Sequence, residues 1–219
     1  MNRMLQFVTV AVLLVFSAMS VAAQSDRNKF EFYGGYSYLR TDTGLDEDLE
    51  DLDVDSNFNS HGFNASLTGN VHRYVGLKAD FSTHSKSRSF TDGTDTASIK
   101  FRTNQFLGGL QFKDNKVDGK RVKPFAHVLA GVANQKITAS GSYIIPEGGS
   151  TTFDDSASTN NFAMVFGAGI DVKVSKRVDI RIIQFDYNPI FFREQDFDDF
   201  TLAGRTQNNF RIGVGIVIH

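Results

Sequence analysis

Charged side chains that recur on one side of alternating stretches are the first candidates for chemistry in this sequence. In an extended chain, residues two apart share a face, so Asp, Lys and Arg at this spacing would meet in one interior. Acids and bases in similar number predict mutual ion pairing, because unpaired charges are costly to bury. The predicted polar network consists of Lys78, Asp80, Asp171, Lys173, Asp179, Arg181, Gln184, Asp186 and Arg211.

Nucleophilic catalysis has one candidate cluster, in "STHSKSRS", where His84 is flanked by Ser82, Ser85 and Ser87. A Ser activated by a neighbouring His could support acyl transfer. The stretch is more typical of a polar approach to a loop, so we predict no enzymatic activity. His127 falls on an inward face, where a hydrogen-bonded structural imidazole is the simpler interpretation. The histidines show no zinc-binding spacing such as HExxH.

An acidic segment offers the best candidate for cation binding. "TDTGLDEDLEDLDVDSN" holds eight acids from Asp42 to Asp55 and no base, and Asp51, Asp53 and Asp55 alternate like the ligands of a calcium loop. The expected glycine at the sixth position and glutamate at the twelfth are absent. We therefore predict a solvated external loop and no metal site. Weak divalent-cation binding that bridges to lipopolysaccharide phosphates is the alternative.

Composition excludes several classes of protein. The chain has no Cys, so it has no disulfide, thiolate metal site, thiol nucleophile or lipid-anchored cysteine. Its formal net charge of -2 at pH 7 gives no basic footprint for nucleic acid. We expect no cofactor.

The first 23 residues have the features of an export signal. Arg3 precedes an apolar run from Phe7 to Phe16, and Val21 and Ala23 occupy the −3 and −1 positions of a cleavage site. A membrane-spanning anchor is the alternative, but the run is shorter than the roughly 20 residues that a span needs. We predict a signal peptide at 1–23 and one domain at 24–219, with a net charge of 22 − 25 = -3.

Alternation of apolar and polar residues runs through the remaining chain. In "FAMVFGAGIDVKV", Phe162, Phe166 and Ile170 share one side while small or charged residues occupy the other. The predicted strands are 30–38, 62–71, 74–82, 106–112, 125–133, 162–174, 178–187 and 209–218. An extra residue near Ile182 and Ile183 suggests a bulge, and the parity of the apolar positions slips between "IKFR" and "FLGGLQF".

The connections alternate in length. Short links at 72–73 and 175–177 alternate with long polar ones at about 41–57, 85–97, 141–158 and 193–206, and 113–123 is an intermediate turn that carries Lys123. This pattern is typical of outer-membrane barrels, with short periplasmic turns and long external loops. No helical pattern is available to cover a sheet, which disfavours a soluble sandwich or a lipocalin-like barrel. The sequence therefore predicts an all-β, eight-stranded antiparallel up-and-down transmembrane β-barrel.

Several stretches strengthen this prediction by resemblance. "FYGGYSYLR", "NASLTGNVHRYVGLKADFS", "PFAHVLAGVA", "IRIIQFDYNP" and "QNNFRIGVGIVI" resemble the small OmpA-type outer-membrane β-barrel proteins over nearly the whole mature chain. The resemblance implies an eight-stranded barrel without established activity, and outer-membrane lipid, lipopolysaccharide and the outer-membrane assembly machinery as partners. The chain departs from the family by ending in His219 and by lacking Trp. Candidates for the interfacial aromatic girdle are Tyr36, Tyr38, Tyr74, Phe112, Phe191 and Phe192.

The function expected from the sequence follows from the interior. A barrel of eight strands is filled by its side chains, so the charged set should close the lumen. We expect a structural or surface-contact role in the outer membrane, with an external surface ligand as an undefined partner. A porin-like conduit for small solutes is the alternative.

Overall fold

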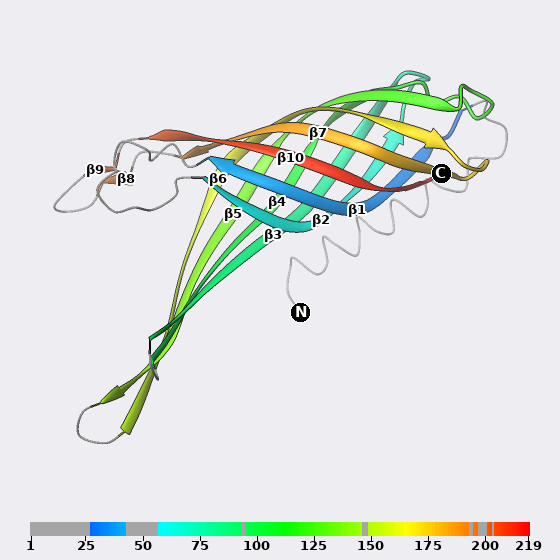
Figure 1. The fold of residues 1–219 in the computed structure, drawn as a ribbon. Helices are drawn as coiled ribbons and strands as arrows, with labels where there is room; N and C mark the ends of the chain where they lie inside the picture. Colours follow the sequence, from blue (N-terminus) through cyan, green and yellow to red (C-terminus); the bar gives the residue numbers. More distant parts are fainter. Residues whose placement is uncertain are drawn as a thin grey trace, which may run out of the picture.

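Alternating sequence builds long strands that close into a barrel (Figure 1). The computed structural model describes residues 27–42, 57–92, 95–145, 149–192, 195–196, 201–202 and 204–219. The predicted signal peptide and the acidic triad Asp51, Asp53 and Asp55 lie outside these residues. The strands are β1 Phe30–Asp42, β2 Asn57–Asn70, β3 Val75–Asp92, β4 Asp95–Lys113, β5 Val122–Ile145, β6 Gly149–Lys173, β7 Val178–Phe192, β8 Gln195–Asp196, β9 Thr201–Leu202 and β10 Arg205–Ile218.

Closure of the sheet confirms the predicted fold class. The order around the barrel is β1-β10-β7-β6-β5-β4-β3-β2, and every neighbouring pair is antiparallel. Pairing of β1 with β10, from Phe32 opposite Ile218 to Asp42 opposite Asn208, removes the sheet edges. β8 and β9 form a separate two-stranded sheet. In the part of the chain described, no helix is long and apolar enough to cross a membrane.

The outer surface of the barrel is an apolar belt. Phe106, for example, is 63% exposed and Ile216 is 53% exposed. Side chains of this kind on every strand of the barrel require hydrocarbon as their solvent. Four of the predicted girdle residues, Tyr36, Tyr74, Phe112 and Phe191, are also exposed. The belt includes Phe32, Phe63, Leu77, Leu110, Val128, Val132, Phe162, Phe166, Ile180, Ile183, Phe185, Phe210, Ile212, Val214 and Ile218.

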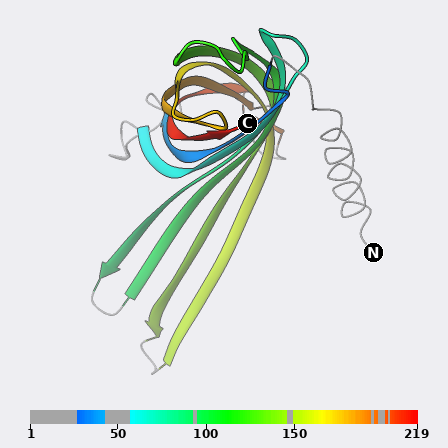
Figure 2. The same cartoon turned by 90° about the vertical axis from the view of Figure 1, so that its right-hand side faces the viewer.

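Strands β3 to β6 continue far beyond the barrel as a four-stranded arm (Figures 1 and 2). We define the arm as residues 86–92 and 95–101 of β3 and β4 with residues 137–145 and 149–157 of β5 and β6. The predicted long loops at 85–97 and 141–158 are therefore wrong. Their residues are mostly small and polar without regular alternation, which sequence patterning cannot distinguish from a loop, yet cross-strand hydrogen bonds hold them as strands.

A change in side-chain type marks where the apolar belt ends and the arm begins. The last belt row on these strands joins Phe106, Val132 and Phe162. The next outward-facing row consists of three asparagines, and Asn134 donates its side-chain amide to Asn160 at 2.8 Å. Since amide side chains avoid hydrocarbon, the arm projects on the watery side of this row.

The register contains the predicted bulge in β7. Ile183 pairs with Ile170 and Arg181 with Asp171, so Ile182 is the extra residue, and the same irregularity appears against β10. The parity slip predicted upstream of Phe106 has another cause. Pairing between β3 and β4 is continuous from Val75 to Asp92, so the apolar residues change face without a bulge.

Candidate functional site

The barrel lumen is the first candidate site, because it concentrates buried charge. Among the described residues, five acids and five bases are less than 6% exposed and face inward from seven strands. The acids are Glu31, Asp80, Asp171, Asp179 and Asp186, and the bases are Lys78, Lys113, Lys123, Arg181 and Arg211. Equal numbers of opposite charges allow the interior to be neutral without a bound ion.

One cluster lies toward the end of the barrel that carries the short turns, which we call the turn end. Lys113 Nζ donates to Glu31 Oε2 at 2.7 Å and to Asp171 Oδ2 at 3.0 Å. Arg181 binds the same Asp171 carboxylate through Nε at 2.8 Å and through its second nitrogen at 3.1 Å. A two-pronged guanidinium contact of this kind fixes both side chains.

A second group at the turn end centres on Asp179. Lys123 Nζ donates to Asp179 Oδ2 at 2.9 Å, and His219 Nε2 lies 2.9 Å from the same oxygen. His219 Nδ1 is 3.9 Å from Glu31, so it joins this group to the first cluster. Lys123 was assigned from sequence to a turn, but β5 begins at Val122 and its alternation places Lys123 inside.

The middle of the lumen is organised around Arg211. Its Nε donates to Asp186 Oδ2 at 2.7 Å, and its Nη1 donates to Asp80 Oδ1 at 3.2 Å. Gln184 accepts from Arg181 at 2.7 Å and donates to Asp186 at 2.7 Å, which links the middle to the turn end. The result is one continuous polar network across the barrel.

Lys78, His127 and aromatic rings complete the network. Lys78 Nζ lies 3.9 Å from Asp80 and 3.3 Å from His127 Nδ1, and His127 Nε2 lies 3.0 Å from Asp186. The Arg181 guanidinium carbon lies 4.0 Å from the centre of the Phe125 ring and 4.3 Å from that of Tyr33. Aromatic faces stabilise a cation that has lost water.

Eight members of the sequence-predicted network line this lumen, and Lys173 does not. Lys173 lies at the last position of β6, half-buried, and its Nζ donates to the Val117 carbonyl at 2.6 Å. Although Lys173 stands opposite Asp179 in the sheet, its amine reaches the turn at Val117 and not the lumen. The network also contains Glu31, Lys113, Lys123 and His219, which were not predicted from the sequence, although strand parity indicated the first two.

The turn end also carries an ion pair outside the barrel wall. Arg73 Nε donates to Asp114 Oδ1 at 3.0 Å between two neighbouring turns. This hydrogen bond is the main reason that the pKa of Asp114 lies below its ordinary value of 3.8. Both side chains are more than a third exposed, so the pair connects two turns and is not a candidate binding or catalytic site.

The prediction that His84 lies in a polar approach to a loop is wrong. β3 carries His84 into the lumen, where it is 2% exposed and its Nε2 shares a 2.8 Å hydrogen bond with Ser37 Oγ. Ser82 is also buried, whereas Ser85 faces outward. The residues of the proposed cluster therefore lie on opposite faces of one strand and do not form a nucleophile–base pair.

An apolar layer lies above the charged plug, toward the open end opposite the turns. Leu107, Leu129 and Ile190 form its core with the small residues Ala133, Ala163 and Val165, and Phe192 packs against it. Phe192 had been expected in the lipid-facing girdle. It points inward instead because Ile190 and Phe192 continue the inward parity of Asp186 and Asn188 along β7.

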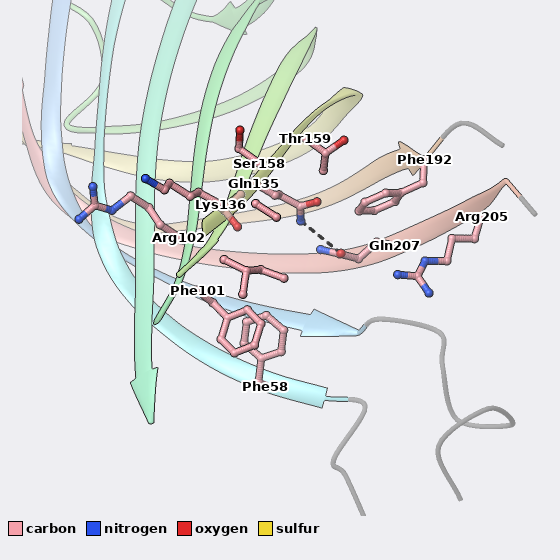
Figure 3. A pocket seen from close by; sticks show the side chains of 13 residues that line it. Phe58, Phe101, Arg102, Gln135, Lys136, Ser158, Thr159, Phe192, Arg205 and Gln207 are labelled. Atoms are coloured by element: carbon pink, nitrogen blue, oxygen red, sulfur yellow. Dashed lines mark hydrogen bonds between the residues drawn. The ribbon is translucent and has the colours of Figure 1, made fainter. Parts of the chain in front are cut away.

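A pocket of about 270 Å³ opens above this layer, which we call the mouth pocket (Figure 3). Phe58 and Phe101 form one wall with ring centroids 5.5 Å apart. Gln135 donates to Gln207 at 3.2 Å across the pocket. Arg205 lies 5.3 Å from the Phe192 ring centre, while Arg102 and Lys136 point away from the other lining side chains (Figure 3). The pocket can hold an apolar group beside a guanidinium.

Metal binding has no support in the residues that the structure describes. No group of three or more His, Cys, Asp or Glu side chains there is arranged to hold a metal ion. The buried acids each face bases or amides, as given above.

The sequence and the fold were compared with known proteins. A family model described as "Outer membrane protein beta-barrel domain" matches residues 9–217. No curated protein sequence matches the chain.

The chain is similar to several solved structures. One is Ail, the attachment invasion locus protein of Yersinia pestis, at 17% identity, TM-score 0.44, over 86% of this chain and 97% of Ail. Another is Neisserial surface protein A, at 9% identity, TM-score 0.49, over 89% and 99%. A third is the outer membrane protease OmpT from Escherichia coli, at 11% identity, TM-score 0.44, over 90% and 99%.

Proposed function

Because the chain belongs to the outer-membrane protein β-barrel domain family, we propose that it is a non-conducting outer-membrane barrel with a structural and surface-contact role. The single observation that carries the proposal is the ion-paired plug. Ten buried charges pair with each other across the lumen, and an ion that entered would have to separate them. Breaking such pairs costs several kcal/mol.

The proposal includes a route and an orientation. Residues 1–23 direct export and are removed, and the outer-membrane assembly machinery inserts residues 24–219. The short turns face the periplasm, as in barrels of this type. The arm and the mouth pocket then face outward, where lipopolysaccharide surrounds the apolar belt.

The contact surface in this proposal is the mouth pocket. Its aromatic walls fit an apolar or aromatic group, and the Arg205 guanidinium, which lies against the Phe192 ring, fits an adjoining carboxylate or phosphate. We propose no catalytic role, since His84 and Ser82 are enclosed in the lumen. The polar plug also argues against the porin-like conduit.

Planar-bilayer recording tests the closed lumen. Purified protein should produce no steady openings, and the variant Lys113→Ala/Arg181→Ala, which removes two cations from the turn-end cluster, should produce small or intermittent currents. Steady openings from the unaltered protein would favour the conduit. A gel assay showing that both proteins remain folded is the control.

Binding of an acidic amphiphile tests the contact role separately. A fluorescent fatty acid should bind detergent-solubilised protein, and Phe101→Ala and Arg205→Gln should each weaken binding by about tenfold. Phe106→Ala is the matched control, because Phe106 lies on the same strand but faces outward. Equal weakening by the control would show that the probe binds the belt.

A further inference from the structure

The arm has two free edges within the described residues. Strand β2 pairs with β3 only as far as Ser85, so residues 86–92 of β3 have β4 as their one strand partner. On the other side, pairing of β6 with β7 begins at Phe162, so residues 149–161 of β6 have β5 alone. Figure 2 shows β3 and β6 as the outer strands of the arm.

Such edges expose backbone donors and acceptors that a further strand can pair with. Neither edge contains Pro, which would interrupt the pairing. Natural proteins keep exposed edges short, and strands average five to six residues. Edges of seven and thirteen residues are therefore long enough to hold another strand.

The two edges carry opposite charges. Lys86 and Arg88 lie on the β3 edge, which has no acid before Asp92, and Asp154 and Asp155 lie on the β6 edge, which has no base. Two β3 edges or two β6 edges would repel each other. A β3 edge and a β6 edge would attract, so the charges favour one heterologous pairing.

The register of that pairing follows from the arm itself. One row joins Lys86 to Phe101, Phe101 to Ile137 and Ile137 to Ala157. If a second copy continues this row, its Lys86 stands opposite Ala157. Because β3 and β6 run in opposite directions, the strands are antiparallel and both barrels keep the same orientation in the membrane.

Two residues further along, this register places Arg88 of the second copy directly opposite Asp155. Both lie on the same face of the arm as Lys86 and Ala157, since each is two residues away. Directly opposed residues have Cβ atoms roughly 4.5–5.5 Å apart, within reach of an ion pair. The register was set by the arm rows alone, and it brings the opposite charges together.

We propose that the arm edges form a homotypic contact, in which the β3 edge of one arm pairs with the β6 edge of a second copy outside the membrane. The contact is head-to-tail and leaves one edge of each kind free, so it extends into rows or rings of barrels. This inference goes beyond the proposed function and is independent of the lumen network, and it places the second copy beside the mouth pocket, which Phe101, Ile137 and Ala157 of the arm also line.

Cysteine cross-linking tests the pairing on a background without native Cys. The same register places Ser87 of one copy opposite Ser156 of the other, and both side chains are exposed. Outer membranes that contain both Ser87→Cys and Ser156→Cys proteins should give a disulfide-linked dimer on mild oxidation. Membranes with either variant alone should give none.

The matched control moves one cysteine out of register. Ser89→Cys, exposed on the same face of the same edge, should cross-link to Ser156→Cys several-fold less, since diagonal neighbours lie roughly 7–8 Å apart. Equal yields for Ser87 and Ser89, dimers from either variant alone, or no dimer from the mixture would each overturn the proposal.

Charge reversal provides a second test on folded protein. Arg88→Asp in the Ser87→Cys copy should lower the cross-link yield by about tenfold, and Asp155→Arg in the Ser156→Cys copy should do the same. Combining the two reversed copies should restore the yield. Additive loss in the combination would contradict an Arg88–Asp155 contact, and heat-modifiable gel migration would verify that all barrels are folded.

Discussion

Removal of the Asp186 charge is the sharpest test of the lumen network. Arg211 Nε lies 2.7 Å from Asp186 Oδ2, Gln184 donates to the same oxygen at 2.7 Å, and His127 Nε2 lies 3.0 Å from the other. Asp186→Asn keeps the shape of the side chain but leaves four buried acids facing five buried bases. Arg211 then retains only Asp80, at 3.2 Å.

The expected cost follows from burial. Asp186 and Arg211 are at most 1% exposed, so water cannot replace the lost partner. Breaking a buried pair from one side costs about 3–5 kcal/mol. Arg211→Gln should cost a similar amount, while the double variant should cost less than the sum by about 1–3 kcal/mol, because no uncompensated Arg211 charge remains.

The assay is urea unfolding of protein folded into lipid vesicles. The chain has no Trp, so the folded fraction is read from gel mobility without heating. Asp118→Asn, a change in the turn at residues 114–121, is the control. Its free energy of unfolding should stay within about 0.5 kcal/mol of the parent value. An Asp186→Asn protein as stable as the parent, or strict additivity in the double variant, would refute the coupled network.

Three further outcomes follow from the same structure. Lys113→Ala, which removes the lysine shared by Glu31 and Asp171, should cost about 3–5 kcal/mol. Lys173→Ala should cost about 0.5–1.5 kcal/mol for one bond to a carbonyl, and equal urea midpoints for the two variants would contradict the difference between a lumen lysine and a turn-bound one. Gly167→Ala should lower the free energy of unfolding by about 1–3 kcal/mol, because the new Cβ would collide with the Asp186 carboxylate and the His127 ring. Gly108→Ala is the matched control and should be neutral, because the Cβ there meets only a carbonyl at 3.9 Å. Since the pKa of Asp114 is lowered in the folded state, the stabilisation from its ion pair with Arg73 is present above pH 3.8 and is lost as the pH falls through the lowered value. Asp114→Asn should therefore cost about 0.2–1 kcal/mol of unfolding free energy at pH 7 and nothing in strong acid. A stability difference that persists in strong acid would exclude the ion pair as its cause.

The barrel was predictable because the solvent on each face of the sheet selects the residue type at every second position. Lipid required Phe166 and Val214 on one side, and enclosure required Asp171 and Arg211 to be on the other. The bulge at Ile182 was visible because it interrupts this alternation. Faces and strand number therefore follow from local pattern.

The arm was not predictable because water bathes both of its faces. Thr151, Thr152 and Ser156 carry no alternation, so strand and loop look alike, and only pairing with β5 defines β6 there. His84 was misplaced because the serines on both sides of it suggested a loop, although its own side chain is enclosed in the lumen. The ion pairs of the lumen, such as Lys113 with Glu31, join residues that are far apart in sequence. The partners were not predictable because they meet only when the barrel closes.

The extra isoleucine in β7, Ile182, shifts the alternation of inward and outward side chains by one residue. Asp179 and Arg181 precede it and Gln184 and Asp186 follow it, and all four face the interior because the bulge absorbs the extra residue, so that Ile182 and Ile183 both face outward. Deleting Ile182 would restore plain alternation and keep all four groups inside, whereas forcing Ile182 into a regular strand would turn the residues on one side of it toward the acyl chains. A change of one residue in the barrel wall therefore requires a bulge to form or to disappear, whereas a change of two residues keeps every side chain on its face.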